Sequence, residues 1–248
     1  MQINLYGICQ LNYLAFIPYF SENNIKNMKI AALVLTIVFA LLSIAELTFC
    51  YLGNDKARKA LKVFCVLDLG IIINLLIPEH PLVYCALYFG ALGDLLLIFK
   101  KNIYFYSGAV SFLVGHLLFI SELLVNLIGE FLPYYFYIIL PISILLTGLL
   151  LIKPLSFVTK NKMAIGGGCI YFNILLHSLA LMITTVCFLP TTFMYFGILG
   201  YVLFITSDFI LCFAKFKKDF KGRQFIVMLT YLLAEAFLSL AFFLTLGL

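Results

Sequence analysis

Residues 191–213 read TTFMYFGILGYVLFITSDFILCF and contain a single charged side chain, Asp208. At about 1.5 Å of rise per residue, an α-helix of this length crosses a hydrocarbon core of about 30 Å. A transmembrane barrel would instead show segments of about ten residues with alternating polarity, which this sequence lacks. Because lipid offers the backbone no hydrogen-bond partners, we expect a transmembrane helix here.

Similar runs recur along the whole chain. Of its 248 residues, 65% are hydrophobic and only 11% are charged, and this composition excludes a soluble globular domain. We therefore predict an all-α, polytopic bundle of eight transmembrane helices. The expected spans are 29–53, 59–77, 82–99, 104–128, 133–152, 165–188, 191–213 and 224–247. Residues 29–248 would form one transmembrane domain, and residues 1–28 an interfacial segment or a ninth span.

The cations predict the orientation of the bundle. Fourteen of the 16 Lys and Arg residues lie on alternate connections or on the helix ends beside them. They are Lys56, Arg58, Lys59, Lys62, Lys100, Lys101, Lys153, Lys160, Lys162, Lys215, Lys217, Lys218, Lys221 and Arg223. The positive-inside rule places these connections in the cytoplasm, with Lys26 and Lys29 on the opposite side. The net charge of +5 therefore indicates membrane orientation rather than a nucleic-acid partner.

Several ionisable side chains fall within the expected spans. A charged group at this depth costs several kcal/mol unless it is paired or hydrated, so each of them is a candidate functional residue. They are Glu46, Asp68, Asp94, His116, His177, Asp208 and Glu235. The seven cysteines lie singly and show no metal-binding spacing, so we expect neither a metal nor a cofactor.

Two of these acids should lie at a similar depth. Asp94 precedes Lys100 by six residues and Asp208 precedes Lys215 by seven, which places both roughly 9–10 Å from the basic end. We expect His116 and Glu235 about 18 Å from that end. Small and polar residues share helix stripes with the acids, which favours close helix contact and inward-facing carboxylates. The stripes are Ala86–Gly90–Asp94, Gly108–Phe112–His116, Gly200–Phe204–Asp208 and Tyr231–Glu235–Ser239.

Four segments together resemble a known family. They read YFGALGDLLLIF (88–99), IYFYSGAVSFLVGHLLF (103–119), GILGYVLFITSDFIL (197–211) and YLLAE (231–235). Their order and spacing resemble the YhhN-type lysoplasmalogenases, a family of eight-helix membrane proteins, over about residues 55–245. Lys62 matches a lysine common at the start of the second helix. Glu235 departs from the family, which usually has Gln there, and the Pro that usually follows the lysine is missing.

The resemblance implies hydrolysis of the vinyl ether bond of a lysophospholipid, a lysoplasmalogen, to a fatty aldehyde and glycerophospho-ethanolamine or -choline. Two carboxylates in one apolar site suit this chemistry, because one can stay protonated as an acid while the other is ionised. We expect Asp94 and Asp208 to form this catalytic pair, with the identity of the acid left open. His116, Ser207, Tyr231 and Glu235 would support the pair, and Lys62 would bind the phosphate.

Two other functions fit the same residues. Intramembrane acids and histidines also form proton relays, so a proton-coupled carrier is the main alternative, although the chain shows no clear inverted repeat. A metal-dependent membrane hydrolase would use His116 and His177 with the carboxylates, but no local histidine pair supports it. Each inward-facing acid could also be a structural hydrogen-bonding group between helices.

Overall fold

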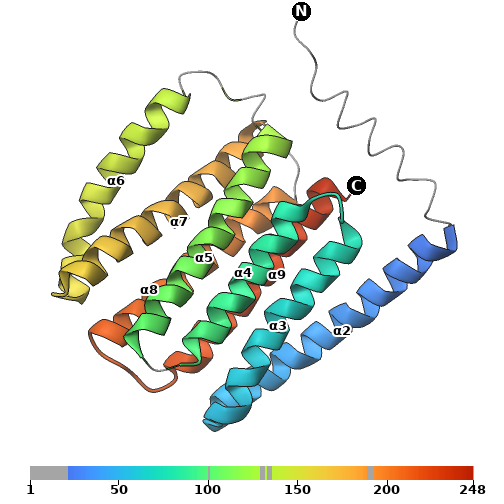
Figure 1. The fold of residues 1–248 in the computed structure, drawn as a ribbon, viewed down its shortest axis with the longest axis horizontal. Coiled ribbons are helices and arrows are strands. Elements are labelled where there is room, and N and C mark those ends of the chain that lie inside the picture. The colour runs from blue at the N-terminus through green and yellow to red at the C-terminus, as the bar shows by residue number, and fades with distance from the viewer. Residues whose placement is uncertain (1–21, 100, 129–131, 133–135, 189–192, 248) are drawn as a thin grey trace, which may run out of the picture.

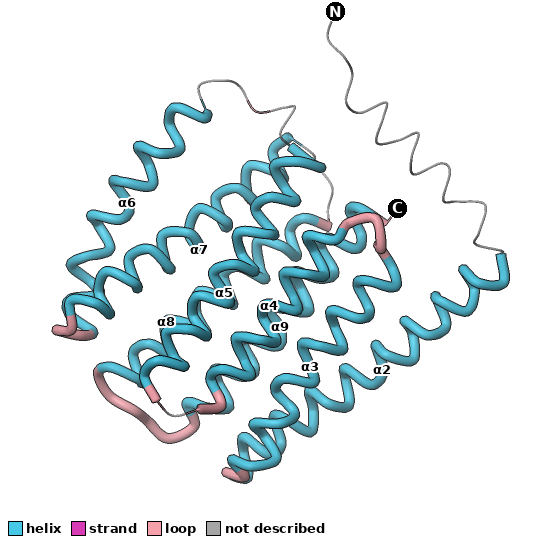
Figure 2. Tube along the Cα trace, in the orientation of Figure 1, coloured by secondary structure: helices cyan, strands magenta, loops and turns pink. Residues whose placement is uncertain are grey.

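The computed structural model describes residues 22–99, 101–128, 132, 136–188 and 193–247, and these are helical except at short connections (Figure 2). The helices are α2 (Glu22–Leu52), α3 (Asp55–Leu76), α4 (Pro81–Leu97), α5 (Asn102–Glu122), α6 (Phe136–Val158), α7 (Lys162–Phe188), α8 (Met194–Phe216) and α9 (Arg223–Leu246). A π-helical segment, η2 (Leu123–Ile128), continues α5. The described residues contain no strand. The predicted all-α bundle is therefore confirmed, and each predicted span corresponds to one helix.

The helices lie side by side, with α2 at one edge of the bundle and α6 at the other (Figure 1). Helices α2, α5, α6, α7, α8 and α9 are long and apolar enough to cross a membrane. Helix α4 is apolar and has 17 residues, which corresponds to about 25 Å. Helix α3 has 22 residues but carries Lys62 and Asp68 within its length. The protein is thus an integral membrane protein.

Two helices extend more than four residues beyond their predicted limits. Helix α2 begins at Glu22, seven residues before the predicted start, because its polar first turns continue the helix beyond the apolar run. Helix α6 ends at Val158 although Pro154 lies inside it. A transmembrane helix can contain a proline, and α6 continues six residues beyond its predicted end at residue 152. Residues 1–21, most of the predicted interfacial segment, lie outside the described residues.

The predicted stripes face the protein interior. All twelve residues of the four stripes are buried. The small residues also bring helices together: a Cβ atom added to Gly115 of α5 would lie 2.9 Å from the carbonyl oxygen of Ala86 on α4. A Cβ atom on Gly200 of α8 would lie 3.1 Å from the carbonyl oxygen of Ala234 on α9. These close contacts pack α4 against α5 and α8 against α9.

Candidate active site

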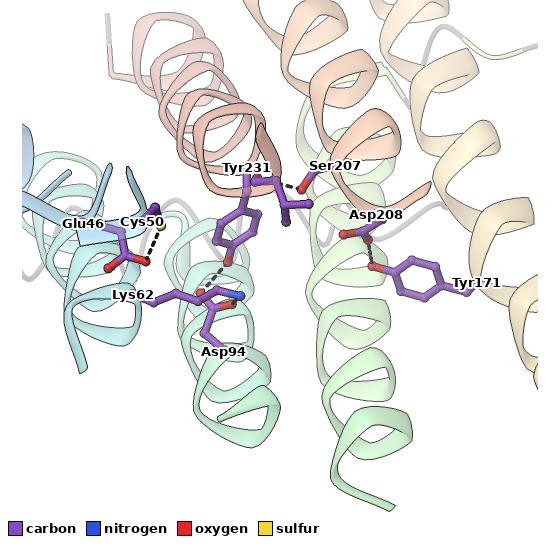
Figure 3. A network of polar contacts seen from close by, with 9 residues as sticks. Glu46, Cys50, Lys62, Asp94, Tyr171, Ser207, Asp208 and Tyr231 are labelled. Carbon is purple, nitrogen blue, oxygen red and sulfur yellow. Dashed lines mark hydrogen bonds and ion pairs between the residues drawn. The ribbon is translucent and has the colours of Figure 1, made fainter. Parts of the chain in front are cut away.

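Asp94 is the most closely surrounded of the buried acids. It lies on α4 and is fully buried. Its Oδ1 atom lies 2.8 Å from Nζ of Lys62 on α3, and its Oδ2 accepts a 2.8 Å hydrogen bond from the hydroxyl of Tyr231 on α9 (Figure 3). The Lys62 ammonium also lies 5.2 Å from the centre of the Tyr231 ring. Asp94 is therefore an ion-paired carboxylate, which is the arrangement that makes a buried charge tolerable.

Glu235 lies beside this cluster, deeper in the membrane. A Cβ atom added to Gly90, one turn before Asp94, would lie 3.4 Å from Glu235 Oε1 and 3.8 Å from the Tyr231 hydroxyl oxygen. The second carboxyl oxygen of Glu235 is buried and has no hydrogen-bond partner among the described residues. The glycine at position 90 therefore leaves room for a third carboxyl group next to Tyr231.

Asp208 has different surroundings. It lies on α8, and its Oδ2 accepts a short hydrogen bond from the hydroxyl of Tyr171 on α7 (Figure 3). No ion pair to Asp208 exists within the part of the chain that the structure describes. The two aspartates thus contrast: Asp94 pairs with a cation, whereas Asp208 is bound by a neutral phenol.

A basic cavity of about 410 Å³ opens above Asp94. Asp94 is the one acid among its lining residues, and five cations surround it. The cations come from the ends of three helices: Arg58, Lys59 and Lys62 from α3, Lys215 from α8 and Arg223 from α9. Such a cavity suits an anionic group, because several cations act together on it.

A second, largely apolar cavity of about 230 Å³ lies between α5, α7 and α8 and contains Asp208 and Tyr171. Leu97, Phe105 and Leu211 line both this apolar cavity and the basic cavity. The two compartments therefore adjoin, and each contains one of the two predicted catalytic aspartates.

The remaining predicted residues lie outside these cavities. Ser207 donates a 3.1 Å hydrogen bond to the carbonyl oxygen of Val227, which links α8 to α9 next to Asp208. His116 is buried among the rings of Phe119, Tyr201 and Phe204, with its centroid 4.4 Å from that of Phe204. Neither nitrogen of His116 has a hydrogen-bond partner among the described residues, and His116 lines neither cavity.

His177 belongs to a different region. Its Nε2 atom lies 3.0 Å from Ser143 Oγ on α6, and its Nδ1 lies 2.9 Å from the Asn173 carbonyl oxygen. His177 therefore joins α6 to α7, as expected for interhelical polar packing. Within the described ranges, His, Cys, Asp and Glu side chains form no group of three or more that could hold a metal ion.

Sequence reasoning missed Tyr171 and most of the cavity cations. Tyr171 follows Lys162 by nine residues, about 13 Å from the basic end, a depth similar to that of Asp208. Comparing depths between helices would have suggested this pairing. The cations were used only to orient the chain, although Arg58, Lys215 and Arg223 lie at the helix ends that surround Asp94.

The fold and the site define a class: a polytopic membrane protein in which buried acids lie beneath a basic cavity. Comparison with known families agrees with the resemblance seen in the sequence. The model of the YhhN family matches residues 57–242, and the chain belongs to this family. No curated protein and no solved structure matches the chain.

Proposed function

We propose that the protein is a membrane-embedded lysoplasmalogenase, which hydrolyses the vinyl ether bond of a lysoplasmalogen. The observation that carries the proposal is the pair of adjoining cavities, one basic and one apolar, with one aspartate in each. Membership of the YhhN family supports the same reaction. The products would be a fatty aldehyde and glycerophospho-ethanolamine or -choline.

The two compartments suit the two ends of a single-chain lipid. The phosphate would bind in the basic cavity, close to Lys59 and Lys215. The alkenyl chain would enter the apolar cavity, whose lining includes the shared residue Phe105 and also Phe172. The vinyl ether joins head group and chain, so it would lie near the boundary between the cavities. Lys62 already pairs with Asp94 and would therefore act on the phosphate only through space.

The surroundings of the two aspartates favour distinct roles. Asp94 is held by the Lys62 ammonium and the Tyr231 hydroxyl, and both groups stabilise its ionised form. Asp208 has no ion-pair partner among the described residues, and burying an unpaired carboxylate is costly. We therefore assign the neutral, proton-donating role to Asp208 and the carboxylate role to Asp94.

In the proposed reaction, Asp208 transfers its proton to the β-carbon of the vinyl ether, which creates an oxocarbenium ion. The Asp94 carboxylate stabilises this cation and takes a proton from the water that attacks it, as the paired acids of glycosidases do. The resulting hemiacetal then collapses. The glycerol oxygen leaves with the proton from Asp94, and the hemiacetal hydroxyl returns a proton to Asp208. One water is consumed, and both acids regain their initial states.

The supporting residues act through these two acids. Tyr231 orients Asp94, and Tyr171 orients Asp208. Ser207 fixes α8 against α9 beside Asp208. Glu235 places a further carboxyl group next to Tyr231, where the family usually has an amide. The proposal assigns His116 no chemical step, because its ring lies among aromatic side chains and lines neither cavity.

The basic cavity also relates to orientation in the membrane. Its cations belong to the fourteen that the positive-inside rule places on the cytoplasmic side. The proposed enzyme would therefore take its substrate from the cytoplasmic leaflet.

The test is aldehyde release by the purified protein in lipid nanodiscs, supplied with an alkenyl lysophospholipid or its saturated alkyl-ether analogue. We expect aldehyde from the vinyl ether alone. Asp94→Asn and Asp208→Asn should each lower the rate by at least about 100-fold, the usual contribution of general acid–base catalysis. Thermal unfolding of the same samples checks that both variants are folded. Full activity in Asp208→Asn would contradict the assigned mechanism.

A proton-coupled carrier is the alternative function, because buried acids can also form a proton relay. Absence of aldehyde with every lysolipid head group would reject the hydrolase. Proton-dependent uptake of a solute into proteoliposomes, lost in Asp94→Asn, would then support the carrier.

A further inference from the structure

Helix α2 buries a carboxylate that the proposed reaction does not use. Among the described side chains of this helix, only Ala32, Glu46 and Cys50 are buried, and the helix otherwise exposes apolar side chains. Glu46 is 0% exposed. A carboxyl group at this depth in a lipid-facing helix must turn toward protein, and its partners then indicate its purpose.

Only one of the two carboxyl oxygens of Glu46 has a hydrogen-bond partner among the described residues. Its Oε1 accepts a 3.7 Å hydrogen bond from Cys50 Sγ, one turn later on the same helix. Its Oε2 is buried and has no hydrogen-bond partner among the described residues. The thiol is a weak donor, so Cys50 alone does not account for a buried acid at this position.

Glu46 lies at the level of the Lys62–Asp94 ion pair. It precedes the end of α2 at Leu52 by six residues, about 9 Å, and Lys62 follows the start of α3 at Asp55 by seven residues, about 10 Å. Both helix ends lie at the basic side of the bundle. Figure 3 shows Glu46 on the α2 side of Lys62, with Asp94 on the other side.

The charged groups around Glu46 belong mainly to α3. Glu46 interacts electrostatically with Arg58 and Lys62 of α3 and, more weakly, with Asp94 of α4. The other titratable groups close to it are the thiols of Cys50 and Cys65. Burial opposes the charged form of Glu46, and these two cations favour it, whereas Asp208 faces Lys62 alone among the described cations. Lys62 thus lies between two carboxyl groups, one from α2 and one from α4. The segment that matches the family model begins at residue 57, so α2 and Glu46 precede it.

We propose that Glu46 is a positioning residue of the site, a second anionic partner of Lys62 that controls how firmly Lys62 holds the Asp94 carboxylate. The inference rests on the proposed function for its catalytic consequence. Glu46 lines neither cavity, so it would act mainly through Lys62, with a weaker direct effect on Asp94. With Glu46 ionised, Lys62 divides its attraction between two anions. When Glu46 is replaced by a neutral side chain, Lys62 is left to Asp94 alone.

The test is a double-mutant cycle of Glu46→Gln and Lys62→Gln, read out by kcat, KM and the pH profile of aldehyde release. We expect Glu46→Gln to move the acid side of the profile to lower pH, because the site loses one negative charge. Lys62→Gln should lower kcat at least tenfold. In the double variant, part of this loss should be restored, because one of the two carboxylates left without a cation has been removed. Glu46→Asp, which keeps the charge, should retain the wild-type profile.

Glu122→Gln is the matched control. Glu122 is equally buried and also has a carboxyl oxygen without a hydrogen-bond partner among the described residues. It lies at the last residue of α5, whereas the basic cavity is lined by Phe105 near the start of that helix. Its combination with Lys62→Gln should be additive. Additive effects of Glu46→Gln and Lys62→Gln, with an unchanged pH profile, would show that Glu46 merely anchors α2 and would overturn the inference.

The same cycle measured by thermal unfolding separates this inference from the proposed function. If the folded wild-type protein is inactive, the hydrolase is rejected. The unfolding cycle still measures the coupling between Glu46 and Lys62. Coupling between the two residues in unfolding supports the inference, and additivity overturns it. If Glu46→Gln does not fold, the neutral variant Glu46→Met, which keeps the length of the side chain, replaces it in the same cycle.

Discussion

The two aspartates differ in the side chains that bind them. Asp94 has an ion pair with Lys62 in addition to its hydrogen bond from Tyr231. For Asp208, Tyr171 is the one hydrogen-bond donor that the described residues provide to the carboxyl group. In the proposed mechanism Asp208 becomes negatively charged as it gives up its proton. The hydrogen bond from Tyr171 would then strengthen during the reaction, so it should affect kcat more than substrate binding.

We therefore predict an asymmetry between the two tyrosines. Tyr171→Phe should lower kcat roughly 10- to 100-fold, the equivalent of a hydrogen bond to a charged group of about 1.5–3 kcal/mol. Tyr231→Phe should lower kcat less than about tenfold, because Lys62 still holds Asp94. The measurement is the rate of aldehyde release at saturating substrate, with unfolding temperatures as the control for packing. A larger loss in Tyr231→Phe would reverse the assigned roles of the two acids.

The residues of the site were predictable to the extent that helix phase determines them. Spacing along α4, α8 and α9 identified Asp94, Asp208 and Glu235 as inward-facing, and all three are buried. Tyr171 was not predicted, because its role depends on how α7 packs beside α8 and not on its own sequence neighbours. The ion pair of Lys62 with Asp94 was not predicted for the same reason.

At the scale of the elements, hydropathy located every helix but not every end. The polar first turns of α2 and the proline within α6 both lie inside helices, and a search for apolar runs does not detect such positions. Hydropathy also does not predict the contacts between helix ends. One of them joins the turn before α4 to the end of α5: His80 Nδ1 lies 2.7 Å from Glu122 Oε1, which also accepts a 2.8 Å hydrogen bond from Asn126 of η2.

This contact predicts a pH-dependent stability. The hydrogen bond that protonated His80 donates to Glu122 raises the pKa of His80 above its ordinary value of 6.5, and this effect exceeds the opposing effect of burial. A raised pKa means that the folded protein binds the proton more tightly, so the stabilisation is complete below about pH 6.5. It is lost as the pH rises through the pKa of the folded state.

We expect the unfolding temperature of the wild-type protein to fall between pH 6 and pH 9 by more than that of His80→Gln. The measurement is a series of thermal unfolding curves in nanodiscs at constant ionic strength. Glu79→Gln, which alters the exposed neighbouring acid, should keep most of the wild-type pH dependence. Parallel pH dependence in the wild type and His80→Gln would show that the pair contributes nothing measurable.

At the scale of the whole molecule, the charges are segregated along the membrane normal. Most cations lie at one end of the bundle, where five of them line the basic cavity, and Asp94 and Asp208 are buried beneath them. An anionic head group bound among the cations would anchor the lipid and hold the vinyl ether at the level of Asp94 and Asp208. The cations would then contribute to binding of the head group, and the acids would contribute to the reaction itself.

This division predicts a change in KM with little change in kcat when a cavity cation is removed. Lys215 lines the basic cavity, so Lys215→Gln should raise KM for a phosphate-bearing substrate by roughly two- to fivefold, the size expected for one partly exposed charge. Lys217 is two residues away, and its Nζ bonds the Phe157 carbonyl oxygen outside the cavity, so Lys217→Gln is the matched control. The effect of Lys215→Gln should shrink at high salt and vanish for an alkenyl glycerol without phosphate. Equal KM changes in the two lysine variants would indicate a general effect of surface charge and would reject the basic cavity as the head-group site.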